Sequence, residues 1–120
     1  YGTVTGVQTC ALPIFNAVAL AGAAAAVGDA AHIRRTRQMT RQGLAYFARE
    51  FKRRGLEYVP SCANFVLVRV GDGDAVFRQL QRQGIIVRPM RAYQLPDWVR
   101  VTVGLPAENR RFIKALAQAV

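Results

Sequence analysis

The sequence predicts an α+β domain: a small antiparallel or mixed sheet of about four strands with helices on one face. Two observations predict it. Four short segments are rich in β-branched and aromatic residues and are bounded by turn residues, at 56–60, 64–70, 85–89 and 98–104. Around and between them, longer segments repeat apolar residues at helical spacing. Such a mixture is typical of helices packed as a layer on a sheet.

Two helices are expected before the first strand. Asn16 can cap an Ala-rich helix that ends near Gly28 and Asp29. A long linking helix follows over about 30–54, and Gly55 supplies its stop. Its expected apolar face consists of Ile33, Thr40, Leu44, Phe47 and Phe51.

Two further helices are expected within and after the strands. The segment "GDGDA" turns into a helix that ends near Gly84, with Asp72 or Asp74 as its cap. Pro106 suits the first turn of the last helix, where Glu108 also complements the helix dipole. The expected inward residues of these helices are Val76, Phe77, Leu80, Phe112, Ile113 and Leu116.

Composition limits the classes of function. The chain has 120 residues, of which 52% are hydrophobic, and a net charge of +10. Fifteen of the 17 basic residues are Arg, but they are spread over several elements and form no single stripe, which argues against nucleic acid as a partner. The Ala-rich run at 11–28 is interrupted by Pro13 and Asn16 and lacks a basic start, so we expect neither a membrane span nor a signal peptide.

The first fourteen residues show neither clear period nor caps. They resemble translated sequencing-adapter read-through, so we interpret 1–14 as a non-native segment, with an ordinary strand-like N-terminus as the alternative. The two cysteines, Cys10 and Cys62, lie far apart, which suits a reducing, cytoplasmic compartment.

Several residue types are present without the pattern that their chemistry needs. His32 has no Cys, Asp or Glu at ligand spacing, so no metal site is expected. Cys62 has no histidine base in its own element and is expected to be a small, partly buried thiol. Lys52 and Lys114 lie on amphipathic helices, and no glycine motif for phosphate binding occurs.

Three arginines lie on the predicted strands. Arg69 is best explained as a solvated strand residue. Arg88 and Arg100 have apolar neighbours, and a guanidinium held on a rigid strand offers a planar fork that matches a carboxylate or phosphate. From the residues alone, a solvated side chain and an anion receptor both remain open for this pair.

The segments "SCANFVLVRV", "GIIVRPM" and "AYQLPDWVRVTVGLPAENRRFIKAL" resemble the C-terminal part of class I/II pyridoxal-phosphate aminotransferases, above all the histidinol-phosphate aminotransferases. The resemblance covers about residues 15–120. It implies that 15–29 ends the large-domain region and that 30–120 forms the small C-terminal domain with the long interdomain helix. Tyr93-Gln94 stands where the family has Tyr-Gly, and "IFN" replaces the common "PFN".

The resemblance also implies roles. Arg100 would hold the substrate's α-carboxylate, Arg88 would help to hold a phosphate end, and Asn64 would belong to the same wall of the site. The family's catalytic lysine and its other cofactor-binding residues lie upstream, so this chain would contain no catalytic and no cofactor-binding residue.

For the intact protein, the resemblance implies a cytoplasmic homodimeric enzyme of histidine biosynthesis that uses pyridoxal 5'-phosphate bound by the upstream domain. Its substrate would be an amino acid or an amino-alcohol phosphate, and the isolated chain would be inactive. Two alternatives remain at this point: a non-catalytic α+β ligand-binding module and a basic RNA-binding domain.

Overall fold

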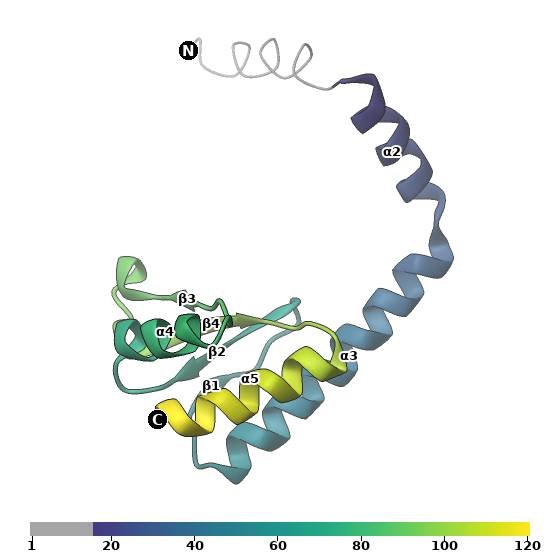
Figure 1. Ribbon diagram of the computed structural model, residues 1–120. Helices are drawn as coiled ribbons and strands as arrows, with labels where there is room; N and C mark the ends of the chain where they lie inside the picture. Colours follow the sequence, from purple (N-terminus) through teal and green to yellow (C-terminus); the bar gives the residue numbers. More distant parts are fainter. Residues whose placement is uncertain (1–15) are drawn as a thin grey trace, which may run out of the picture. The chain divides into compact units, whose positions relative to one another are not determined.

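The computed structural model describes residues 16–120 (Figure 1). The predicted segment 1–14 lies outside the described residues. The elements in chain order are α2 (Ala17–Gly28), α3 (Ala30–Arg53), β1 (Tyr58–Val59), β2 (Phe65–Arg69), α4 (Gly73–Arg82), β3 (Arg88–Pro89), the 3-10 helix η1 (Arg91–Tyr93), β4 (Trp98–Thr102) and α5 (Pro106–Ala119). The predicted order of helices and strands is therefore confirmed, and η1 is an addition that the sequence did not indicate.

The chain divides into two compact units, one ending at Arg35 and one comprising Thr36–Val120. In the first unit, Asn16 caps α2 as predicted, because its side-chain oxygen accepts a hydrogen bond from the Ala19 amide at 2.7 Å. Asp29 ends α2, and its carboxylate accepts a hydrogen bond from the His32 amide at 2.8 Å. None of the residues of α2 is buried within the described chain.

The second unit contains a four-stranded sheet in the order β1-β2-β4-β3, and all three pairings are antiparallel. Alternate residues of β2 and β4 are buried on one face of this sheet and pack against side chains of α3, α4 and α5. The ribbon of these helices lies beside the sheet in Figure 1. The main buried residues are Phe47, Phe51, Val66, Val68, Val76, Leu80, Val99, Val101, Phe112, Ile113 and Leu116. The predicted fold class, with helices on one face, is confirmed.

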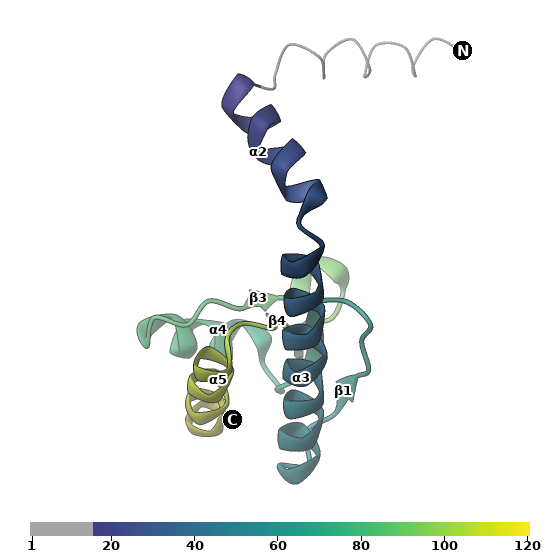
Figure 2. The same cartoon turned by 90° about the vertical axis from the view of Figure 1, so that its right-hand side faces the viewer.

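Aromatic packing joins two of the covering helices. The Phe47 ring stacks on the Phe51 ring at 5.6 Å between centroids and meets the Phe112 ring edge-on at 5.6 Å. Helices α3 and α5 accordingly run side by side in both views (Figure 2). The predicted apolar face of α3 is confirmed at its C-terminal half, but Ile33 is 44% exposed within the described residues and does not join this core.

The third strand is shorter than predicted. Only Arg88 and Pro89 pair with β4, whereas the sequence suggested 85–89. The Ile85 amide instead donates to the Leu80 carbonyl at 3.0 Å and closes the turn that ends α4 around Gly84, which has a φ of 71°. Because the helix-ending turn uses the backbone amide of Ile85, pairing with the sheet begins only at Arg88.

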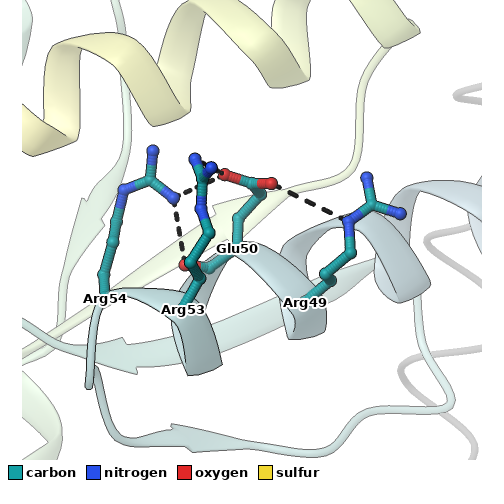
Figure 3. Close-up of polar contacts among 4 residues, drawn as sticks. All are labelled: Arg49, Glu50, Arg53 and Arg54. Atoms are coloured by element: carbon teal, nitrogen blue, oxygen red, sulfur yellow. Dashed lines mark hydrogen bonds and ion pairs between the residues drawn. The ribbon is translucent and has the colours of Figure 1, made fainter.

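A buried carboxylate at the end of α3 was not singled out by the sequence. Glu50 is 8% exposed, and its Oε2 accepts hydrogen bonds from Arg53 at 2.9 Å and from Arg54 at 2.5 Å (Figure 3). The Arg49 guanidinium lies 3.8 Å from the other carboxylate oxygen. The hydrogen bond from Arg54, followed by the charges of both neighbours, lowers the pKa of Glu50 against the opposing effect of burial.

Candidate functional site

The candidate site lies on the face of the sheet that no helix of residues 36–120 covers. Successive residues of a strand point to opposite faces, so the burial of Val99 and Val101 places Arg100 on the other face. In the same way, burial of Val87 places Arg88 away from the core. Both arginines therefore belong to the uncovered face.

The two arginines are direct cross-strand neighbours. Arg88 of β3 pairs with Arg100 of β4 in the antiparallel register. Side chains that are directly opposite in such a pair project on the same face, with Cβ atoms about 4.5–5.5 Å apart. Two like charges in this arrangement are unfavourable by themselves. An anion between them would remove that repulsion.

The surroundings of Arg100 hold its guanidinium without neutralising it. The guanidinium carbon lies 5.0 Å from the centroid of the Phe65 ring, in a cation–π contact. Within residues 16–120, no carboxylate lies within ion-pair distance of Arg100 or of Arg88. The pair therefore presents two unneutralised guanidinium groups.

Arg69, on the same face, differs from this pair. Its guanidinium donates to Asp97 at 3.1 Å and to Glu57 at 3.2 Å, and the side chain is 52% exposed. These hydrogen bonds raise the pKa of Arg69 above its ordinary value, and the bond to Asp97 has the larger effect. The interpretation of Arg69 as a surface strand residue is confirmed, with two ion pairs that the sequence did not reveal.

The connection between Arg88 and Arg100 is tied down by backbone hydrogen bonds. The Met90 amide donates to Trp98, and the Gly73 amide at the start of α4 donates to Pro96 at 2.9 Å. Gln94, which ends η1, adopts a left-handed conformation with a φ of 60°. The glycine that the resemblance leads us to expect at this position would adopt this conformation without strain, so the backbone at Gln94 is one that favours glycine.

Asn64 lies at the start of β2 and is exposed. Its backbone carbonyl accepts a hydrogen bond from the Val103 amide at 2.8 Å. The residue lines a hollow beside α3, and neither Arg88 nor Arg100 lines that hollow. The structure thus brings the two arginines together and places Asn64 beside α3.

The described residues offer no obvious place for a cofactor or metal ion. Lys52 and Lys114 are both exposed on helices. Cys62 is exposed rather than partly buried, because it lies in the loop between β1 and β2, on the wall of an open hollow beside α3. Residues 16–120 contain no group of three or more His, Cys, Asp and Glu side chains that could hold a metal ion. None of the helices in this range has the length and apolar character that a membrane crossing requires.

Residues 7–116 match the model of the aminotransferase class I and II family, and the chain belongs to this family. Members of the family depend on pyridoxal phosphate.

Comparison with individual proteins gives a narrower class of aminotransferase than the family match does. The chain is 51% identical over 109 residues to histidinol-phosphate aminotransferase 1 of Cupriavidus pinatubonensis and 51% identical over 106 residues to histidinol-phosphate aminotransferase of Symbiobacterium thermophilum. Each match covers 88% of this chain, which spans 29% of the length of these relatives. The crystal structure of the histidinol-phosphate aminotransferase from Clostridium acetobutylicum shares the fold, with a TM-score of 0.67 and 24% identity over 76% of this chain and 29% of that one.

Proposed function

We propose that this chain is the C-terminal part of a histidinol-phosphate aminotransferase and supplies the arginines that bind the anionic ends of its substrates. One observation carries the proposal: Arg88 and Arg100 are adjacent on one sheet face, and no carboxylate of residues 16–120 neutralises them. The names and identities of the curated relatives support the choice of substrate. No observation favours an RNA-binding surface, since the Phe65 ring is already occupied by Arg100.

The contribution of this chain to amino-group transfer is to bind and orient the substrate. The cofactor supplies the electron sink for the reaction. Both lysines of the described residues are exposed on helices, so we assign attachment of the cofactor to the rest of the enzyme. Arg100 binds the α-carboxylate of an amino-acid substrate and Arg88 helps to bind a phosphate end, whereas Asn64 lines the hollow beside α3 and is not assigned to the site of this pair. Fixing the substrate at an anionic end limits its motion at the reacting carbon. We also propose that the complete enzyme is a cytoplasmic homodimer in histidine biosynthesis.

Replacing Arg100 tests the proposal in the complete enzyme that contains this chain. We expect Arg100→Ala to reduce kcat/KM by an amount equivalent to about 2–5 kcal/mol, because a charged hydrogen-bonded pair with the substrate is lost. Arg82→Ala removes an exposed guanidinium on α4 and serves as the matched control. An unchanged kcat/KM for Arg100→Ala would remove the role assigned to it.

Replacing Arg88 tests the second anchor. Arg88→Ala is expected to weaken substrates that bear a phosphate more than amino acids that lack one, measured as the ratio of kcat/KM values for the two substrate types. Equal losses for both types would contradict a phosphate-binding role.

The 120-residue chain by itself is expected to show neither transaminase turnover nor the visible absorbance of covalently bound pyridoxal phosphate.

A further inference from the structure

A second group of unneutralised arginines lies away from the sheet face. The loop before β2 and the part of α3 in the compact unit line a hollow of about 500 Å³. Its polar lining includes Arg37, Thr40, Arg41, Ser61 and Asn64, and Cys62 lies on the same wall. The first three are on α3 and the others on the loop.

The positive charge of this hollow is not balanced by the described chain. Arg37 and Arg41 are four residues apart on a helix and therefore lie on the same face, one turn from each other. No carboxylate of residues 16–120 lies within ion-pair distance of either. Arg53, the last residue of α3, and Arg54, which follows it, differ because both are paired with Glu50.

The remaining polar groups of the hollow can donate to an anion. Hydroxyl groups of Thr40 and Ser61 and the amide of Asn64 are hydrogen-bond donors, and the Ser61 oxygen already accepts from the Ala63 amide at 3.0 Å. Two guanidinium forks with added neutral donors match the several oxygens of a phosphate group. The volume is larger than one phosphate and lies in the range of small-molecule sites, about 300–1,000 Å³.

We propose that this hollow is a binding site for a small phosphate-bearing molecule, with Arg37 and Arg41 as its two cationic contacts. The site is separate from the Arg88 and Arg100 pair, since neither of those residues lines the hollow. The inference rests on the charges and geometry of α3 and its facing loop, and it does not require the proposed transaminase function.

Cys62 provides a local readout for this proposal. In a Cys10→Ser background, Cys62 is the remaining cysteine of the 120-residue chain, and it is exposed on the wall of the hollow. We would measure its alkylation by uncharged iodoacetamide with inorganic phosphate as the probe, against chloride at equal ionic strength. A bound anion should slow the reaction about fivefold at a phosphate concentration about four times the dissociation constant, because the free fraction falls as 1/(1 + [L]/Kd).

Three double variants locate the anion, with circular dichroism as the check of folding. Arg37→Gln/Arg41→Gln should abolish protection by phosphate, and each single variant should weaken it. Arg82→Gln/Arg110→Gln removes the same charge from exposed positions on α4 and α5 and should leave protection intact. Arg88→Gln/Arg100→Gln should also leave it intact, which separates this site from the proposed substrate site.

Absence of protection in the parent chain would overturn the proposal. So would equal losses in the Arg37/Arg41 and Arg82/Arg110 variants, which would indicate a general effect of net charge. Loss of protection confined to the Arg88/Arg100 variant would place the anion on the sheet face and would equally reject a site beside α3.

Discussion

Gly73→Ala is expected to destabilise the compact unit through the contact between α4 and the segment that leads into β4. Gly73 is the buried first residue of α4. A Cβ atom at this position would lie 2.6 Å from the Trp98 carbonyl oxygen and 2.8 Å from the Pro96 carbonyl oxygen. Both are backbone atoms, so a side-chain rotation cannot relieve the overlap. Either α4 or the start of β4 must move.

The magnitude follows from three contributions. Overpacking a buried contact costs about 1–3 kcal/mol. Moving the helix also weakens the hydrogen bond from the Gly73 amide to Pro96, now 2.9 Å long, with a net value of about 1 kcal/mol. In the opposite direction, the higher helix propensity of alanine stabilises the folded chain by at most about 1 kcal/mol relative to glycine. We therefore expect the free energy of unfolding to fall by about 1–3 kcal/mol.

Urea unfolding of the 120-residue chain, followed by circular dichroism, measures this effect. With a denaturant slope of about 1 kcal/mol per molar in urea, the midpoint should fall by about 1–3 M. Gly22→Ala is the matched control, since Gly22 is helical and its new Cβ would meet no atom within 4 Å. A midpoint for Gly73→Ala equal to that of the control would refute the steric reasoning.

Two further predictions concern buried polar groups. Asn109 is 4% exposed and makes two hydrogen bonds with the Gly104 backbone, at 2.9 and 3.0 Å, so Asn109→Ala should lower the free energy of unfolding by about 2–3 kcal/mol in the same urea assay; a change below about 0.5 kcal/mol would contradict it. Arg54 and Arg53 lower the pKa of Glu50 from its ordinary 4.5, so its stabilisation is complete above that value and is lost as the pH falls through the lower folded-state pKa. The free energy of unfolding should be measured from about pH 6 to about pH 3, the range in which carboxylates titrate. It should fall less steeply with decreasing pH in Glu50→Gln than in the parent chain. Parallel profiles would show that the ion pairs of Glu50 do not contribute to stability.

The helices were predictable because their signals are local. Asn16 caps α2 and Asp72 caps α4 through hydrogen bonds to amides two or three residues away, which depend on nearby sequence alone. The glycine at position 55, with a φ of 66°, likewise ends α3 where expected. The short β3 was harder, because the amide of Ile85 had two competing uses and the helix-ending turn took it.

The α+β class, the order of the elements and the position of Arg88 and Arg100 on strands could be predicted from the sequence, because alternation and helical spacing are properties of neighbouring residues. Three features became visible only in the folded chain: the two arginines are cross-strand partners, Arg69 is ion-paired with Glu57 and Asp97, and Asn64 lines a hollow beside α3. Strand register and long-range ion pairs depend on segments distant in sequence, and their geometry exists only once the chain has folded.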